Sequence, residues 1–491
     1  MRILHLDIDS LRPDHLGCYG YHRNTSPNID ALATESLRFS NYYVTDSPCL
    51  PSRTALISGR FGITTGVVNH GGVCADIPPE GPSRGFRSRY SATTLGSVLR
   101  SAGLWTASIS PFPWRHTAYQ MFYGFNETID TGGGGLENAD EIYPHVRDWI
   151  ERHADRDDWY LHVNFWDPHT PYDAPIEFGN PFEDDPIDPW ITEEVLAAQR
   201  SSYGPHSATE VRGYEPVLDD RTTLGVPEIR GLADAKRHMD GYDTGIRYVD
   251  HYLGLIFQQL KDAGIWDETA VVVTADHGES QGELNVWGDH QTADHTVNRV
   301  PLIVKWPGIT DPYAGKEHPG LFYHIDFAAT LADLCGADIP VEWEGASFSQ
   351  RLSPSDPGRD HLVLSQGAWC LQRAVRWENW ILIRTYHTGL KDLRKWMLFD
   401  LSTDPHETTN LAPSRPEIVA EGEAKLEAFL AEKLPSAWRG DPFEIVLNEG
   451  GAYHANENGP EWLRYLERLR QTGRTHHAEW LEQHGGKPRE G

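Results

Sequence analysis

The stretch RILHLDID (residues 2–9) predicts a buried β-strand that ends in acidic residues. Helix patterns followed by strand patterns then recur along the chain, in residues 26–44, 91–110, 139–166 and 242–278. Because helices that alternate with strands usually cover a parallel sheet, this order predicts an α/β fold. We therefore expect a large, mainly parallel sheet sandwiched by helices.

Polar residues stand where several of these predicted strands end. They are Asp7 and Asp9, Asp167 and His169, and Asp276 and His277. In sheets of this kind, ligands bind beyond the carboxyl ends of the strands. The sequence therefore predicts an active site at that end of the sheet.

The length of 491 residues exceeds the size at which a single core usually stops growing. We assign residues 1–355 to a catalytic α/β domain, in which residues 175–231, rich in Pro, Asp and Gly, form an insertion over the sheet. Residues 356–491 predict a smaller C-terminal α+β subdomain. It combines short antiparallel strands with a polar helix over residues 417–434 and a polar helical tail.

The charge balance excludes one class of partner. With 43 basic and 72 acidic residues, the chain has a net charge of −29, so it does not bind nucleic acid through bulk charge. An anionic substrate must instead meet a locally cationic pocket. The odd number of scattered cysteines, five, argues against a disulfide framework. The sequence starts with a strand pattern and has no long apolar stretch, so we expect a cytoplasmic protein without a membrane partner.

Cys49 lies between two prolines in SPCLPSR (residues 47–53), immediately before a predicted helix. The run CLPSR resembles the Cys-x-Pro-Ser-Arg signature of type I sulfatases, in the alkaline phosphatase superfamily. Other segments resemble that family in the same order: DSLRPDHLGCYGY (9–21) with SPNIDALA (26–33), TALISGR (54–60), DPHTPYDAP (167–175), VVVTADHGE (271–279), RVPLIVKWPG (299–308) and LFDLSTDPHETTNLA (398–412). The resemblance covers residues 1–412 and implies an alkaline phosphatase-like version of the α/β fold.

The resemblance implies that Cys49 is a precursor. In that family a formylglycine-generating enzyme oxidises the cysteine to Cα-formylglycine, whose hydrated aldehyde is the nucleophile. One hydroxyl attacks sulfur, and deprotonation of the other then expels sulfate and restores the aldehyde. Position 49 should lie at a helix N-terminus, where backbone N–H groups favour developing negative charge. Arg53, one turn along the helix, can reach back toward it.

By the same resemblance, one divalent cation is held by Asp9, Asp276, His277 and the hydroxyl of residue 49. Carboxylate oxygens suit Ca²⁺ or Mg²⁺, and family habit favours Ca²⁺. Its charge lowers the pKa of the nucleophile and neutralises a sulfate oxygen. Many sulfatases carry Asp-Asp on the first strand, whereas this chain has Asp9-Ser10. Asp7, on the same strand face as Asp9, either substitutes for the missing carboxylate or is a buried hydrogen-bonding group.

His169 resembles the family histidine that binds the sulfate group or protonates the leaving oxygen, and Asp167 could orient it. Two lysines of the family pattern are missing here. At the first place, SISPFPWRHTAY (108–119) offers Arg115 as the cation and His116 as the proton donor. At the second, WGDHQTADHTVNRVPL (287–302) offers Asp289, His290, Asp294 and His295, of which His290 fits best by its spacing from Arg299.

Asn69 and His70, in GVVNHGG (66–72), follow the predicted nucleophile helix and can contact substrate. The resulting candidate site has two parts. Catalytic roles are assigned to Cys49, Arg53, His116, His169 and His290, and substrate contacts to Asn69, His70, Arg115 and His295.

Three functions fit these residues. The leading hypothesis is a sulfuric-ester hydrolase that removes sulfate from a sulfated sugar or oligosaccharide. The first alternative is a phosphonate monoester or phosphodiester hydrolase of the same superfamily, which the Asp9-Ser10 departure fits. The second is a non-catalytic carbohydrate-binding protein of the same fold in which Cys49 is never converted. Rates on sulfate, phosphate diester and phosphonate substrates separate the first two hypotheses, and carbohydrate binding without turnover by fully matured protein would support the third.

Overall fold

An eight-stranded sheet forms the centre of the molecule. The computed structural model describes residues 1–81, 88–213, 224–452 and 460–490. Along the sheet the strands follow the order β11 (Glu317–Tyr323), β2 (Leu37–Tyr43), β10 (Leu302–Lys305), β7 (Thr269–Thr274), β1 (Arg2–Ile8), β6 (Trp159–Phe165), β4 (Trp105–Ile109) and β5 (Glu127–Ile129). Strand β10 runs antiparallel to both of its neighbours, and the other pairs are parallel. The prediction of a large, mainly parallel sheet is confirmed.

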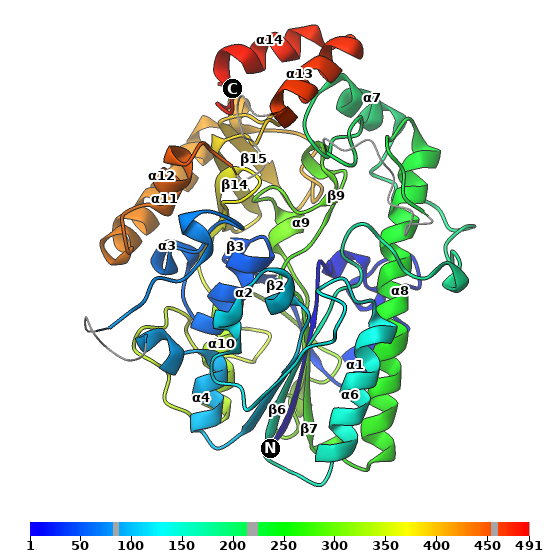
Figure 1. The fold of residues 1–491 in the computed structure, drawn as a ribbon, viewed down its shortest axis with the longest axis vertical. Coiled ribbons are helices and arrows are strands. Elements are labelled where there is room, and N and C mark those ends of the chain that lie inside the picture. The colour runs from blue at the N-terminus through cyan, green and yellow to red at the C-terminus, as the bar shows by residue number, and fades with distance from the viewer. Residues whose placement is uncertain (82–87, 214–223, 453–459, 491) are drawn as a thin grey trace.

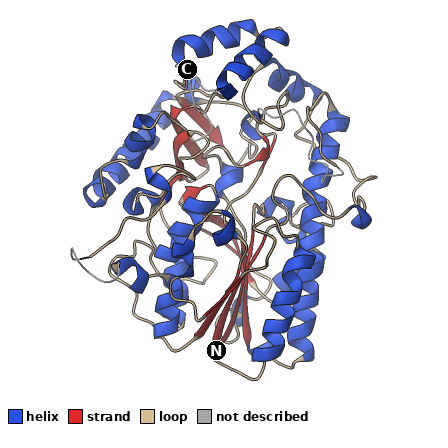
Figure 2. Cartoon of the chain, in the orientation of Figure 1, coloured by secondary structure: helices blue, strands red, loops and turns tan. Residues whose placement is uncertain are grey.

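Helices cover both faces of this sheet (Figure 1, Figure 2). One face carries α1 (Pro27–Ala33), α6 (Ala139–His153) and α8 (Leu232–Asp262), and the other carries α2 (Cys49–Ser58), α4 (Leu95–Ser101) and α10 (His324–Leu334). Among the described residues, the structure has no helix with the length and apolarity needed to span a membrane.

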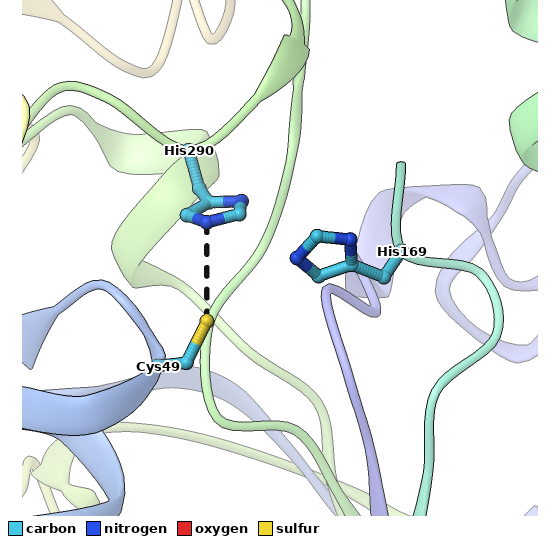
Figure 3. Close-up of side chains that lie close together, drawn as sticks. All are labelled: Cys49, His169 and His290. Atoms are coloured by element: carbon cyan, nitrogen blue, oxygen red, sulfur yellow. Dashed lines mark hydrogen bonds between the residues drawn. The ribbon is translucent and has the colours of Figure 1, made fainter. Parts of the chain in front are cut away.

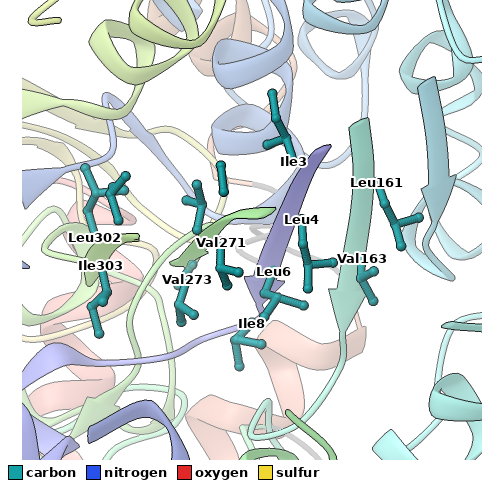
Figure 4. Packing of buried hydrophobic residues seen from close by; sticks show 14 of the residues in the cluster. Ile3, Leu4, Leu6, Ile8, Leu161, Val163, Val271, Val273, Leu302 and Ile303 are labelled. Atoms are coloured by element: carbon teal, nitrogen blue, oxygen red, sulfur yellow. The ribbon is translucent and has the colours of Figure 1, made fainter. Parts of the chain in front are cut away.

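Strand β1 lies in the middle of the hydrophobic core. All seven of its residues are buried, and β6 and β7 pair with it in parallel on either side. Figure 4 shows Ile3, Leu4, Leu6 and Ile8 packed among side chains of these neighbouring strands. A strand that is covered on both faces needs almost continuous apolar residues, which explains the pattern of residues 2–8. Asp9 follows where the strand leaves the core.

A second, five-stranded sheet has the order β15 (Trp396–Asp400), β14 (Trp380–His387), β13 (Leu371–Trp377), β12 (His361–Gln366) and β3 (Asp46–Ser47). The predicted smaller C-terminal sheet is thus present. Its last strand, β3, comes from the N-terminal part of the chain and pairs in parallel with β12. Because β3 directly precedes Pro48 and Cys49, the C-terminal sheet helps to fix the backbone that leads into α2.

The remaining α-helices and short strands surround these two sheets. They are α3 (Gly62–Thr65), α5 (Phe112–Arg115), α7 (Glu193–Ser201), α9 (His295–Asn298), α11 (Pro416–Lys433), α12 (Pro442–Asn448), α13 (Pro460–Gln471), α14 (Thr475–His484) and the paired strands β8 (Ser280–Gln281) and β9 (Trp287–Asp289). The domain boundary at residue 355 and the insertion over residues 175–231 remain predictions. Residues 214–223 of that insertion lie outside the described residues.

The N-terminus of α1 is capped from another helix. Ser26 occupies the N-cap position, but its hydroxyl donates to Asp30 and does not accept from the first turn. The carboxylate of Asp250, in α8, instead accepts hydrogen bonds from the backbone N–H groups of Asn28 and Ile29, at 3.1 and 2.8 Å, and from the Asn28 side chain at 2.8 Å. A carboxylate at a helix N-terminus satisfies donors that the helix itself leaves unpaired.

We expect Asp250→Ala to lower the free energy of unfolding by about 1–3 kcal/mol, because it leaves buried N–H groups without an acceptor. Urea unfolding measures the change. Asp262→Ala, which removes an exposed carboxylate from the last turn of the same helix, is the matched control. Equal unfolding midpoints for the two variants would show that this cap does not stabilise the fold.

Candidate active site

Cys49 is the first residue of α2 and is 2% exposed. Its predicted position at a helix N-terminus is confirmed. The Ser52 hydroxyl donates to the backbone carbonyl of Asp276, which ties the first turn of α2 to the segment that follows β7. Burial, followed by the nearby charge of Asp9, raises the pKa of the Cys49 thiol to about 12. The side chain is therefore a protonated thiol at neutral pH and a poor nucleophile.

One set of neighbours on Cys49 can hold a hard cation. Asp9 follows β1, Asp276 and His277 follow β7, and their ligand atoms and the Cys49 sulfur all lie within 4.8 Å of one another. The distance from Cys49 Sγ to His277 Nε2 is 3.0 Å. Nδ1 of His277 lies 2.7 Å from the Gly278 carbonyl oxygen, which can only accept, so Nδ1 carries the proton and Nε2 faces Cys49 with its lone pair. Burial lowers the pKa of His277 to about 3, which keeps the ring neutral as a metal ligand must be.

Arg53 lies among three buried carboxylates. Its guanidinium contacts Asp7 and lies 3.0 Å from both Asp9 and Asp276. The sequence spacing predicted that Arg53 reaches back toward residue 49, and in the structure it binds the carboxylates around that residue instead. Asp7 also contacts His162, at 3.3 Å. Its contacts are thus those of a buried hydrogen-bonding carboxylate, the second of the two roles that the sequence left open.

The charges of this cluster fit a divalent cation. One guanidinium faces three carboxylates, and burial together with the charges of Asp9 and Asp7 raises the pKa of Asp276 well above its usual range. Oδ2 of Asp276 is buried and lies 3.0 Å from the Arg53 guanidinium, which it shares with Asp7 and Asp9. Hard oxygen donors with uncompensated negative charge are what Ca²⁺ and Mg²⁺ require. The residues present therefore fit the expected ion.

Two histidines lie on another side of Cys49 (Figure 3). Nε2 of His290 is 3.9 Å from the Cys49 sulfur, and the rings of His169 and His290 are 5.2 Å apart. Nδ1 of His290 lies 3.0 Å from the carboxylate of Glu279. Nδ1 of His169 hydrogen-bonds to the carbonyl of Thr170. Each ring is therefore held through Nδ1, which leaves both Nε2 atoms on the side of Cys49.

Aromatic stacking fixes the planes of these rings. His169 stacks on Trp166 at 3.8 Å, and the guanidinium of Arg115 lies 3.9 Å from the ring of Trp166. His290 stacks on His277 at 4.0 Å. Glu279 and Trp166 are positioning residues that the sequence reasoning missed. Glu279 ends the segment VVVTADHGE, and Trp166 directly precedes the segment DPHTPYDAP. Their positions beside these two motifs could have indicated a role in the site.

The residues around the start of α2 include three more candidates. Nε2 of His70 lies 3.4 Å from the backbone nitrogen of Leu50, and the Asn69 side chain accepts from the His70 N–H at 2.7 Å. The rings of His70 and His116 are 5.3 Å apart. Burial, with the charge of Arg115, lowers the pKa of His116 to about 4. The ring of His116 is therefore neutral at neutral pH, and its role as proton donor stays a prediction.

Two further expectations do not match the contacts. His295 contacts residues outside this cluster: its Nδ1 lies 2.9 Å from the Tyr43 hydroxyl, and its backbone N–H donates to Glu407. These hydrogen bonds hold His295 at the junction with the second sheet. Asp167 does not orient His169, because its carboxylate accepts the backbone N–H of Ala139 at the start of α6, at 2.8 Å.

A pocket of about 380 Å³ adjoins the histidines, since Thr170 and Gly288 are among its lining residues. Residues 206, 211, 212, 225 and 226 of the predicted insertion contribute to its wall. Six of the lining side chains are aromatic or basic: Arg115, Tyr172, His206, Arg212, His238 and Trp287. Space for an organic group thus lies next to the segments that carry His169 and His290.

Comparison with known proteins gives one consistent result. Residues 2–337 match the Sulfatase family model, and residues 282–433 match the model of the N-sulphoglucosamine sulphohydrolase C-terminal region. The choline-sulfatase of Rhizobium meliloti is 25% identical over 476 residues, which cover 88% of this chain and 87% of that protein.

Solved structures of other proteins resemble this chain over most of its length. A protein in complex with its substrate D-glucosamine-2-N,6-O-disulfate has a TM-score of 0.69 at 19% identity, covering 90% of this chain and 99% of that one. A phosphonate monoester hydrolase from Silicibacter pomeroyi has a TM-score of 0.67 at 20% identity, covering 88% and 95%. At such identities these likenesses establish the fold alone.

Proposed function

The chain belongs to the sulfatase family and is a sulfatase enzyme, and we propose that it removes sulfate from sulfated sugars with a formylglycine made from Cys49 as its nucleophile. The observation that carries this proposal is the position of Cys49 between two sets of side chains. Ligand atoms of Asp9, Asp276 and His277 lie within 4.8 Å of its sulfur, and so do those of His169 and His290. A sulfate ester needs both, because its oxygens must be neutralised while its leaving group takes up a proton.

Asp9, Asp276 and His277, together with residue 49, would hold one divalent cation, for which we expect Ca²⁺ rather than Mg²⁺. When bound, the cation supplies positive charge that lowers the pKa of the nucleophile and neutralises a sulfate oxygen. A formylglycine hydrate supplies two hydroxyls at the first position of α2, where backbone N–H groups favour negative charge. The maturation partner in this proposal is a formylglycine-generating enzyme.

The side chains of the site then have separate tasks. Arg53 balances the charge of the carboxylates that would face the cation, and Asp7 holds Arg53 in place. His290, paired with the Glu279 carboxylate, is the better placed of the two histidines to carry a proton, because a carboxylate stabilises imidazolium more than the carbonyl beside His169 does. We assign His290 to the leaving oxygen and His169 to the sulfate group.

Because His290 and His169 have different roles, the rates of their variants should depend differently on the leaving group of the substrate. His290→Ala should reduce kcat/KM by roughly 10²-fold or more on an alkyl or sugar sulfate, and much less on 4-nitrophenyl sulfate, whose leaving group needs no proton. His169→Ala should reduce both rates by similar factors. The measurement is kcat/KM on both substrates for both variants. The reverse pattern would make His169 the proton donor.

The substrate class rests on the adjoining pocket and on what related proteins act on. Aromatic side chains in the pocket wall that keep some exposure, such as Tyr172 and His206, suit the apolar face of a sugar ring. The structural neighbour bound to D-glucosamine-2-N,6-O-disulfate and the N-sulphoglucosamine sulphohydrolase C-terminal match point to the same class.

The test compares reaction classes on converted enzyme. 4-Nitrophenyl sulfate, bis(4-nitrophenyl) phosphate and 4-nitrophenyl phenylphosphonate carry the same chromophore, so their kcat/KM values are directly comparable. We expect the sulfate to be hydrolysed fastest. Faster phosphonate or diester hydrolysis would replace the proposal by the phosphonate hydrolase alternative, for which Asp9-Ser10 is the supporting observation.

A second panel tests the leaving group. Glucosamine sulfates and choline sulfate are offered to the same converted enzyme, and sulfate release is measured. Turnover of the sugar sulfates is expected. Preference for choline sulfate would contradict the sugar assignment, and sugar binding without any turnover would support the non-catalytic alternative.

A further inference from the structure

Cys49 belongs to two overlapping groups of metal-binding side chains. Among the described residues, its sulfur is shared by a group with Asp9, Asp276 and His277 and by a second group with His169 and His290. All members of both groups are buried, and within each group the ligand atoms lie within 4.8 Å of one another. The first group is the expected cation site. The second has no role in that site.

The two groups differ in chemistry. The first contains two carboxylates, which favour Ca²⁺ or Mg²⁺. The second consists of a sulfur and two imidazole nitrogens, and this combination selects Zn²⁺ and related d-block ions. The sulfur is present only while residue 49 is an unconverted cysteine, since formylglycine carries oxygen in its place.

The geometry of the second group suits a tetrahedral ion. Zn–S and Zn–N bonds of about 2.3 and 2.0–2.1 Å place the donor atoms roughly 3.3–3.6 Å apart. Cys49 Sγ and His290 Nε2 are 3.9 Å apart, and no pair in the group exceeds 4.8 Å, so small side-chain rotations bring the donors to these distances. Figure 3 shows both rings facing the sulfur from different elements.

The hydrogen bonds that hold the rings of His169 and His290 are typical of a metal site. Metal-binding histidines usually donate their other ring N–H to a carboxylate or a backbone carbonyl. His290 meets the carboxylate of Glu279 through Nδ1, at 3.0 Å, and His169 meets the Thr170 carbonyl through Nδ1. Both Nε2 atoms are thereby left for a ligand. Nε2 of His277, 3.0 Å from the sulfur, is available as a fourth donor.

We propose that the unconverted chain binds one Zn²⁺ ion, or a similar thiophilic divalent ion, through Cys49 Sγ, His169 Nε2 and His290 Nε2. The thiol proton passes to solvent as the metal–sulfur bond forms, and no oxidation state changes. The ion occupies the side of residue 49 on which these histidines would otherwise meet a sulfate group. Oxidation of Cys49 removes the sulfur donor, so maturation changes the metal preference of the site from thiophilic to hard ions.

The experiment uses the full chain produced without a formylglycine-generating enzyme. Co²⁺ is the probe, because a cobalt–thiolate bond adds a charge-transfer band in the near ultraviolet and tetrahedral Co²⁺ has intense visible bands. Titration should give one Co²⁺ per chain with both signatures, and Zn²⁺ should displace it. Cys49→Ser should abolish the thiolate band.

Variants of the two groups decide which side chains bind the ion. His169→Gln and His290→Gln should each weaken Co²⁺ binding by roughly 100-fold or more, whereas Asp276→Asn should leave it nearly unchanged. Cys335→Ser and His251→Ala, which alter a cysteine and an exposed histidine elsewhere, are the matched controls. Thermal unfolding of each variant identifies any that fail to fold.

Two results would overturn the proposal. One is the absence of Co²⁺ binding, or Co²⁺ binding without a thiolate band. The other is a thiolate band that survives both histidine variants and is lost in Asp276→Asn, which would put the ion among the carboxylates. The proposal does not depend on hydrolysis of any ester, since it concerns the unconverted chain. If the cobalt titration fails, the rates of the converted enzyme can still be interpreted. If those rates contradict the proposed function, the cobalt titration of the unconverted chain can still be interpreted.

Discussion

Cys49→Ala is expected to lower sulfate-ester hydrolysis by roughly 10⁴- to 10⁶-fold in protein co-expressed with a formylglycine-generating enzyme. Loss of a covalent nucleophile removes the pathway itself, and only the binding and charge of the site remain. The substitution deletes one buried sulfur atom from the N-terminus of α2, so the fold should persist. Stopped assays of sulfate release and circular dichroism measure the two effects.

Cys74→Ala is the matched control for this variant. Cys74 is also buried, at 1% exposure, and its sulfur contacts the Pro442 carbonyl rather than the metal-binding groups. The control should retain the activity of the parent enzyme. Normal rates in Cys49→Ala would exclude residue 49 as the nucleophile, whatever its modification.

Asp276→Ala is expected to remove the bound metal and the activity together. The carboxylate of Asp276 belongs to the metal-binding group and shares Arg53 with Asp9, so its loss takes both a ligand and a charge from the cation site. We expect kcat/KM to fall by roughly 10³-fold or more, because the charge of a catalytic metal is worth several kcal/mol in the transition state. Elemental analysis of the purified protein reports the metal.

Asp7→Asn is the informative comparison. It removes another carboxylate from the same guanidinium, but Asp7 is not part of the metal-binding group. This variant should keep its metal and lose less activity. Suppose instead that Asp276→Ala kept its metal and Asp7→Asn lost it. Asp7, rather than Asp276, would then supply the carboxylate ligand that Ser10 replaces in the Asp-Asp pair of many sulfatases.

Much of the candidate site was predictable because it depends on local pattern and on one topological rule. The buried strand patterns located the ends of β1, β6 and β7, and these strands are neighbours in the sheet. Asp9, His169 and His277 therefore come together as the carboxyl ends of parallel strands do. The rigid run around Cys49 likewise predicted the start of α2 from residues close in sequence.

What the sequence could not predict depends on long-range pairing. The short strand β3 joins the second sheet through β12, more than 300 positions later in the chain, and no local pattern specifies that partner. The cap of α1 comes from Asp250, although Ser26 stands at the position that local rules favour. The direction of His295 is decided by Tyr43 and Glu407, which are distant in sequence.

The most direct test of the account is the mass of the tryptic peptide Phe39–Arg53 from protein co-expressed with a formylglycine-generating enzyme. This peptide contains Cys49 and ends at the arginine of CLPSR. We predict an aldehyde at position 49, seen as a loss of mass relative to the thiol peptide and as reaction with a hydrazide. An intact thiol in protein made with an active maturing enzyme would contradict the central claim that Cys49 is the precursor of the nucleophile.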